Sequence, residues 1–186
     1  MSSDVVQAPH GPLPEGGAVR PMTRWGIPVM HRRQADVTAY DDDLRTLVAD
    51  MVATMYAADG VGLAATQIDV HERVIVIDTS EARDEPIVLI NPELIEMSEE
   101  MTLVDEGCLS VPEVYDKVPR HARVRVRALD RAGEAREFEA EGLLSIAVQH
   151  EMDHLLGKVF VEYLSPLKRT RIKTRMLKKT RDEARV

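Results

Sequence analysis

The amino-acid sequence predicts an α+β fold, in which mainly antiparallel strands pack around a central helix with an N-terminal helix and a C-terminal helix beside it. Three patterns support this prediction. Apolar residues recur at three- and four-residue steps from Leu44 to Met55, apolar and basic residues alternate over 123–128, and 143–155 is a largely apolar segment with two histidines. A period near 3.6 is typical of an amphipathic helix, and a period of two is typical of a half-buried strand.

The composition is that of an ordinary globular protein. Of the 186 residues, 44% are hydrophobic and 30% are charged, which favours one domain with a sizeable core. No apolar run approaches the length of a membrane span, and the N-terminus lacks the pattern of a secretory signal, so we expect a cytoplasmic protein without a membrane partner. The single cysteine, Cys108, excludes an intramolecular disulfide and is inert core, a reactive thiol or a metal ligand.

Three regions differ in composition. Residues 1–21 contain four prolines and three glycines without apolar periodicity, which predicts a flexible N-terminal extension. Residues 22–164 are expected to form the main domain. Residues 165–186 form a basic C-terminal helix or tail with nine basic and two acidic residues, a net charge of +7, whereas the rest of the chain carries −15.

The elements of the main domain follow in order. A helix starts near Asp41 and ends at Gly60, since an apolar stripe lies between an acidic cap and a glycine. Short strands are predicted at Arg73–Asp78 and Ile87–Ile90, the second closed by Asn91-Pro92. The alternating strand at 123–128 then turns through 130–133 into a partner strand containing Phe138 and Ala140.

The histidine segment predicts a metal site. In a helix His150 and His154 lie one turn apart on one face, and Glu151 has the spacing of a general base beside two ligands. The alternative is a solvated polar helix with two surface histidines. The surrounding leucines, isoleucine and valine favour a buried helix, in which two imidazoles and a carboxyl need partners or a metal to offset their desolvation.

A third ligand is needed, and two positions are informative. Metalloproteases with this helical motif can place a third histidine six residues after the second, but here that position is Phe160, which cannot bind a metal. Cys108 is the upstream candidate, because a nearby cation converts a thiol into a thiolate ligand. The segment 60–67, with two glycines and two alanines, is a tight turn or a place where the backbone approaches a ligand.

Together, the segments 60–67, 106–110 and 149–154 resemble the three signature motifs of the peptide deformylase family, in order and at matching separation. The similarity runs from about Arg20 to the C-terminus. It implies a metal-dependent hydrolase that removes the N-formyl group from the initiator formyl-methionine of nascent polypeptides and releases formate. The main alternatives are a zinc endoprotease or amidase of another class, disfavoured by Phe160, and a structural metal module that binds RNA through its tail.

The resemblance also implies residue roles. The metal ligands would be Cys108, His150 and His154, with a water at the open position that the metal activates. Glu151 would be the general base and then the general acid, while the Gln67 amide and the backbone N–H of Leu109 would donate to the formyl oxygen. The expected metal in cells is Fe²⁺, with Zn, Ni or Co possible in purified protein.

The resemblance further implies a methionine slot and a supporting shell. The slot residues are expected to be Val61, Val104, Leu143, Ile146 and Ala147, and Gly62 is expected to bind the substrate peptide through its backbone groups. Asp153, Arg120 and Glu106 are expected to hold the metal-binding helix in place, with Asp153 paired to Arg120. Some family members carry an arginine where this chain has Tyr115, so preference beyond methionine stays open. The expected partners are formyl-methionyl nascent peptides and, through the basic tail, the ribosome; we expect a monomer.

Overall fold

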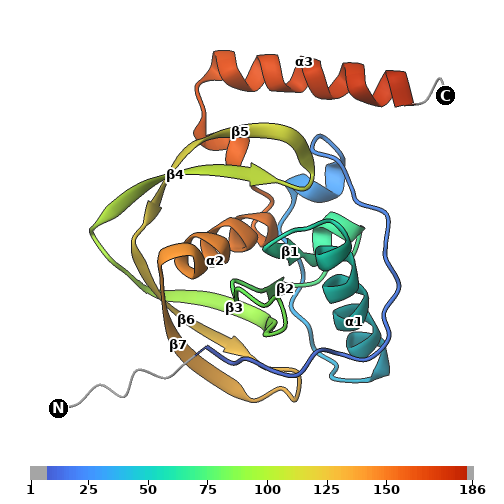
Figure 1. Ribbon diagram of the computed structural model, residues 1–186, viewed down its shortest axis with the longest axis vertical. Helices are drawn as coiled ribbons and strands as arrows, with labels where there is room; N and C mark the ends of the chain where they lie inside the picture. The colour runs from blue at the N-terminus through green and yellow to red at the C-terminus, as the bar shows by residue number, and fades with distance from the viewer. Residues whose placement is uncertain (1–7, 184–186) are drawn as a thin grey trace.

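The computed structural model describes residues 8–183 and shows the central helix between two β layers (Figure 1). Helix α2 (Gly142–Leu155) lies between a five-stranded sheet on one side and a two-stranded hairpin on the other. Helix α1 (Asp42–Ala57) packs at the edge of the large sheet, and helix α3 (Pro166–Glu183) runs along the outside of the hairpin. The predicted α+β class is confirmed.

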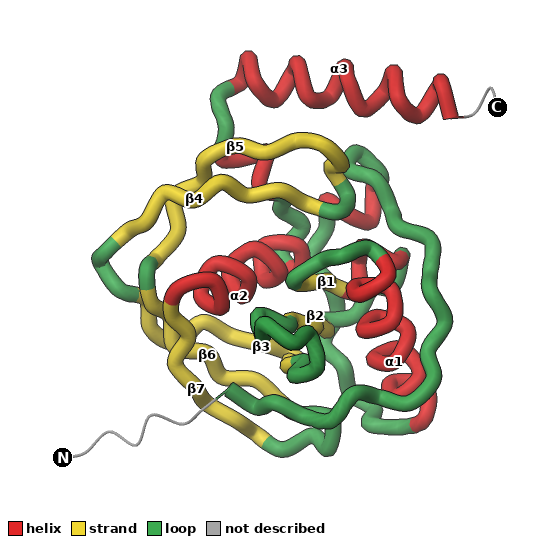
Figure 2. The backbone as a smooth tube through the Cα atoms, in the orientation of Figure 1, coloured by secondary structure: helices red, strands yellow, loops and turns green. Residues whose placement is uncertain are grey.

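The large sheet has the order β1-β2-β3-β6-β7, and every neighbouring pair is antiparallel. Its strands are β1 (Gly62–Ala64), β2 (Val74–Ile77), β3 (Ile87–Met97), β6 (Arg123–Leu129) and β7 (Ala135–Glu141). The alternation predicted for β6 is confirmed, because Val124, Val126 and Ala128 are buried. Figure 2 shows that β1 is short, and it lies at one edge of the sheet.

The second sheet is a long hairpin of β4 (Met101–Cys108) and β5 (Val111–His121). The strands predicted from the sequence do not include this hairpin. Because Cys108 pairs with Val111, the connection is the two residues Leu109 and Ser110, and the register shifts between Gly107 and Cys108. The hairpin therefore ends in a tight turn directly over α2.

Helix α1 begins where the sequence predicts, but it ends at Ala57 rather than at Gly60, because the left-handed residue that follows it is Asp59, with φ of 54°. The N-cap Asp41 accepts a hydrogen bond from the backbone N–H of Leu44, as predicted for the start of α1. Gly157 follows α2 with φ of 78°, the left-handed conformation that ends many helices. Three short 3₁₀ helices complete the chain, at Pro28–His31, Ala65–Ile68 and Phe160–Tyr163.

The strand predicted at 87–90 does not end at Asn91-Pro92, so that prediction is wrong: the corresponding strand β3 continues to Met97. Asn91 has φ of 49°, and the register against β6 shifts between Ile90 and Glu93. A proline is tolerated at such a bulge, where no ladder N–H is required from it. The Asn91 amide also bonds both backbone groups of Val37, which closes the irregular position.

The segment before the main domain lies along the body. His10 forms an isolated bridge with Ile87, and the backbone N–H of Ala18 donates to the Asp50 carboxylate at 2.7 Å. Arg20 pairs with the same carboxylate at 2.9 Å. Flexibility of residues 1–21 stays a prediction, and the stretch 1–7 lies outside the described residues.

No helix within residues 8–183 combines the length and the apolar content that crossing a bilayer requires.

Candidate metal centre and active site

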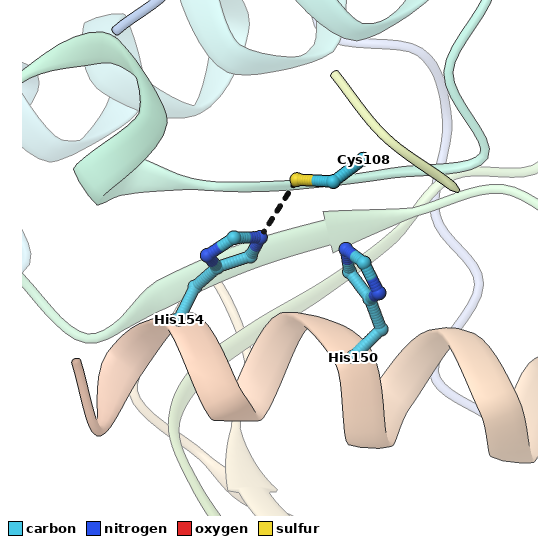
Figure 3. A group of neighbouring side chains, drawn as sticks. All are labelled: Cys108, His150 and His154. Carbon is cyan, nitrogen blue, oxygen red and sulfur yellow. Dashed lines mark hydrogen bonds between the residues drawn. The ribbon is translucent and has the colours of Figure 1, made fainter. Parts of the chain in front are cut away.

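Three side chains bring metal-binding atoms together above α2 (Figure 3). His150 and His154 project from successive turns of the helix, and Cys108 reaches them from the end of β4. Their donor atoms lie within 4.8 Å of one another, and all three residues are buried. The Cys108 Sγ lies 3.3 Å from His154 Nε2. One thiol and two imidazoles at this separation form a donor set that suits a divalent transition metal.

A buried charge network fixes one of the imidazoles. Glu106 Oε2 lies 2.8 Å from His150 Nδ1, and Arg120 donates to both oxygens of Glu106 at 2.6 and 3.0 Å. Arg120 also donates to Asp153 at 2.7 Å, so the expected pair is present. This network links β4, β5 and α2. It leaves the opposite nitrogen of His150 facing Cys108 and His154.

Glu151 has the environment of a poised carboxyl group. Only 4% of it is exposed, and its Oε2 has no hydrogen-bond partner among the described residues. Its other oxygen lies so close to the backbone of Gly62 that a Cβ there would be 2.5 Å away. A buried carboxyl oxygen without a partner is costly unless a ligand, water or ion completes it.

Burial controls the protonation of this group and its neighbours. Desolvation raises the pKa of Glu151 to about 7, with a smaller opposing effect of His150. Desolvation also lowers the pKa of His154 well below its ordinary value, which favours the neutral imidazole that binds metals. For His150 desolvation acts in the same direction, but contacts with Cys108 and Glu106 outweigh it and raise the pKa.

A cleft of about 440 Å³ opens beside these groups. One wall is the glycine-containing segment before β1, the opposite wall is the β4–β5 hairpin, and the floor is α2. Gln67 is 1% exposed and lies at the inner end, where its Oε1 accepts from the backbone N–H of Ala64 at 2.9 Å. Its Nε2 therefore points toward Ser110 Oγ, 3.2 Å away, and Cys108 Sγ, 3.6 Å away.

The family model described as polypeptide deformylase matches residues 19–170 of the chain. The chain belongs to the peptide deformylase family. It is 60% identical over 158 residues to peptide deformylase 1 of Ralstonia nicotianae, an alignment that covers 85% of this chain and 94% of that protein. It is also 51% identical over 162 residues to the peptide deformylase of Cellvibrio japonicus, covering 87% and 96%.

Solved peptide deformylases share the fold. The crystal structure of the enzyme from Legionella pneumophila superposes with a TM-score of 0.85 at 44% identity, covering 91% of this chain and 99% of that one. The enzyme from Ehrlichia chaffeensis in complex with actinonin gives 0.84 at 36% identity, covering 87% and 98%.

The chain is therefore a hydrolase that removes the N-formyl group from the formyl-methionine of nascent polypeptides and releases formate. The family and the Cys/His/His group together imply a bound metal ion. The residues fit that ion, because the three donors converge and the adjacent Glu151 Oε2 has no hydrogen-bond partner within residues 8–183.

The structure brings almost all predicted peptide deformylase site residues to the cleft. All six residues predicted to bind substrate border it, as do the three positions proposed for chemistry: Val61, Gly62, Val104, Leu143, Ile146, Ala147, Glu151, Gln67 and Leu109. Cys108, His150 and Glu106 also reach its surface, whereas His154, Arg120 and Asp153 lie behind it. The assigned roles are taken up below as proposals.

Sequence reasoning missed part of the outer rim, which includes Asp59, Asp105, Pro112, Glu113 and Val114. Tyr115, noted as an unusual position, also lies there and covers Gly107 so closely that a Cβ would be 2.4 Å from its ring. No regular polar and apolar alternation marks the two strands of this rim, because the buried positions of the hairpin include the polar residues Glu106 and Arg120.

Proposed function

We propose that Cys108, His150 and His154 hold one divalent metal ion, and that Glu151 and Gln67 act with it in deformylation. The observation that carries this proposal is the convergence of a buried thiol and two imidazoles beside a buried carboxyl with an unpartnered oxygen. When bound, the metal supplies Lewis-acid chemistry and lowers the pKa of a bound water toward neutrality.

The chain's own residues handle the protons and the developing charge. Glu151 accepts a proton from the attacking water and delivers it to the departing amine, and burial has already raised its pKa to about 7, near the range a general base needs. The Gln67 Nε2 and the backbone N–H of Leu109 donate to the formyl oxygen as it becomes negative. The Ala64 contact supports this role, because it fixes the Gln67 amide with its donor end toward Cys108.

The methionine side chain fits the apolar part of the cleft. Val61 and Val104 stand on opposite walls, and Leu143, Ile146 and Ala147 provide one face of α2 between them. Leu143 is 54% exposed in the free chain, so a bound apolar side chain would remove it from water. Gly62 borders the cleft and would offer its backbone groups to a peptide bound in an extended conformation.

Glu106, Arg120 and Asp153 would position the ligand helix. Arg120 is 3% exposed and bonds both carboxylates, and Glu106 in turn bonds His150. A partner of this kind fixes the ring orientation of a metal-binding histidine.

We propose Fe²⁺ as the metal in cells, with Zn, Ni or Co able to replace it in purified protein. Two nitrogens and a thiolate suit each of these ions, so affinity alone does not select one. Elemental analysis of protein purified without oxygen, compared with protein purified in air, tests this. Stoichiometric iron in the first preparation supports the proposal, and zinc in both overturns it.

The decisive experiment measures formate release from a formyl-methionyl tripeptide by metal-loaded wild type and Glu151→Gln. Glu151→Gln keeps the shape of the side chain, so turnover should fall by about 10²–10⁴ while bound metal is retained. Glu139 is exposed on β7, so Glu139→Gln is the control and should have the activity of wild type. Full activity in Glu151→Gln would overturn its role. Tightly bound metal without turnover in wild type would point to a structural metal module.

We also propose that α3 contacts ribosomal RNA. Lys168 pairs with Asp116, and Arg175 and Lys179 pair with Glu113, so one face of α3 is tied to β5. The other face presents exposed cations, including Lys173, Lys178 and Arg181, to solvent. Phosphates would attract these cations, and the acidic body would keep the contact at the tail.

Ribosome binding can be tested by sedimentation at increasing salt. Binding should weaken steeply with salt. A triple variant in which Lys173, Lys178 and Arg181 are all replaced by alanine should bind the ribosome less tightly than wild type. The control removes the same charge from the large sheet through Arg125, Arg127 and Arg136→Ala. Salt-independent binding, or equal loss in both variants, would contradict the contact.

The chain is proposed to act as a cytoplasmic monomer with its catalytic domain at residues 22–164. Formylated nascent chains are cytoplasmic in bacteria, and the family match at 19–170 supports these limits. Light scattering at working concentration tests the monomer, and a dimer mass would exclude it.

A further inference from the structure

Arg83, in the loop between β2 and β3, reaches the back of the glycine-containing wall of the cleft. Its Nη2 donates a hydrogen bond to the backbone carbonyl of Gly60. Its guanidinium also lies over the Tyr56 ring, 5.3 Å from the centroid. A planar guanidinium can stack on an aromatic face while its N–H groups donate in the plane, so the two contacts are compatible. Arg83 itself does not line the cleft.

The same loop binds the next carbonyl of the wall. The backbone N–H of Asp78 donates to the Val61 carbonyl at 2.8 Å. The Asp78 carboxylate accepts from the Tyr56 hydroxyl at 2.5 Å, so Tyr56 is held at its hydroxyl and covered on its face. One loop therefore binds the carbonyls of two consecutive residues that line the cleft, Gly60 and Val61.

The wall that this loop holds closely approaches the Glu151 carboxyl group and the side chain of Leu109, two of the three residues proposed to act on the formyl group. A Cβ at Gly60 would lie 2.6 Å from the Leu109 side chain, and a Cβ at Gly62 would lie 2.5 Å from Glu151 Oε1. Strand β1, which begins at Gly62, pairs with β2 on one side and ends the order of the described sheet on the other. An extended peptide can use such an edge. Movement of this wall would therefore change the width of the cleft and the edge offered to the peptide.

We infer that Arg83 is a positioning residue for substrate binding, which sets the place of the Gly60–Gly62 wall by holding the Gly60 carbonyl from behind. The inference rests on the proposed role of this cleft as the peptide site. Among the described residues, Arg83 bonds Gly60 and stacks on Tyr56, and it forms no hydrogen bond or ion pair with the three metal-binding side chains or with Glu151. Its loss should therefore act on substrate binding, through KM, rather than on the chemical step.

The test compares kcat and KM of four variants on a formyl-methionyl tripeptide, well below their melting temperatures. Arg83→Ala should raise KM about fivefold and leave kcat within about twofold. The lysine in Arg83→Lys can donate a hydrogen bond but lacks the planar guanidinium that stacks on Tyr56, so this variant should raise KM about twofold. Tyr56→Phe keeps the ring under the guanidinium and loses only the Asp78 bond, so KM should stay unchanged while stability falls.

Arg131→Ala is the matched control, because Arg131 also donates to a single backbone carbonyl, that of Pro12, away from the cleft. Its kcat and KM should equal those of wild type. An unchanged KM in Arg83→Ala, a loss confined to kcat, or an equal KM rise in Tyr56→Phe or Arg131→Ala would overturn the inference. If Arg83→Ala does not fold, Arg83→Lys decides, and an unchanged KM overturns the inference. Failure of the proposed site would give a different result, because the Glu151→Gln variant would then retain the activity of wild type.

Discussion

At Gly62 the absence of a side chain determines where the Glu151 carboxyl group can lie. A Cβ at this position would be 2.5 Å from Glu151 Oε1 and 2.9 Å from its Cγ. Gly62→Ala should therefore push the carboxyl aside by a fraction of an ångström or more. A displacement of about 1 Å at a reacting group can cost about 10²-fold in rate, and we expect a fall in kcat of about 10–10²-fold with metal retained.

Gly16→Ala provides the comparison for this prediction. Gly16 has φ of 76° with open space around its Cβ position, so alanine there introduces backbone strain without a clash. It should lower the melting temperature and leave kcat unchanged. Kinetics and metal analysis on both variants separate the two effects, and a Gly62→Ala enzyme with normal kcat would show that Glu151 is not confined by this backbone.

Gln67 offers a second prediction at the scale of one residue. Its amide is oriented by Ala64 and points its donor end toward Cys108. If it donates to the formyl oxygen, Gln67→Ala should lower kcat by about 10²–10³, because one oxyanion donor is worth this much in comparable sites. Metal content should not change, since the three ligands stay. A loss below about tenfold would leave the Leu109 N–H as the main protein donor.

Between elements, Arg120 joins the hairpin to the ligand helix. It extends from β5, is 3% exposed, and bonds Glu106 on β4 and Asp153 on α2. Arg120→Met would leave two buried carboxylates without their cation. Removing one partner of a buried ion pair costs about 3–5 kcal/mol, and urea unfolding should show a loss of this size.

Arg127→Met is the control for the hairpin joint. Arg127 lies on β6, is 52% exposed at its side chain, and pairs with Glu137 on β7. Exposed pairs of this kind contribute about 0–1 kcal/mol, so this variant should be close to wild type. Similar losses in both variants would mean that Arg120 contributes no more than a surface pair.

Whether a secondary-structure element could be predicted depended on how close together in the sequence its determining residues lie. The helices α1 and α2 were predicted because their apolar stripes, caps and end signals all lie within one segment. The hairpin was largely missed because its buried positions include Glu106 and Arg120, which are polar and become favourable only through each other and Asp153. Those partners are 14 and 33 residues from Arg120 in sequence. No periodicity within the strand encodes them.

The site was predictable to a greater extent than the hairpin that builds it. Two ligands and Glu151 share one helix, so their spacing alone indicated a metal site. The sequence made Cys108 only a candidate for the third ligand, and the resemblance assigned it that role, because its approach to the helix depends on the hairpin register. The wall contact of Arg83 has no sequence signal, since it depends on a loop with Arg83 itself at φ of 58°.

At the scale of the whole molecule, acidic and basic residues are concentrated in different regions of the chain. The sequence showed an acidic body and a basic tail, and the structure shows that three tail cations, Lys168, Arg175 and Lys179, pair with acids of β5. These pairs are exposed and individually weak. Their effect is geometric, because they hold α3 along the outside of the hairpin (Figure 1), while Lys173, Lys178 and Arg181 of the same helix stay exposed.

Acid stability of the whole molecule should depend on Asp78. Burial alone would raise the pKa of this carboxyl, but hydrogen bonds from Ser80, Tyr56 and Glu85 outweigh burial and place the pKa below the ordinary 3.8. A carboxyl with a lowered folded pKa contributes stability that is complete above the unfolded value and is lost as pH falls through the folded one. Asp78→Asn should therefore be less stable than wild type at pH 7 and pH 5, and the difference should shrink below about pH 3.8. Urea unfolding of both proteins across this range measures the difference. A gap that persists unchanged at pH 3 would show that the Asp78 charge does not contribute to stability, and that shape or neutral hydrogen bonding accounts for the loss.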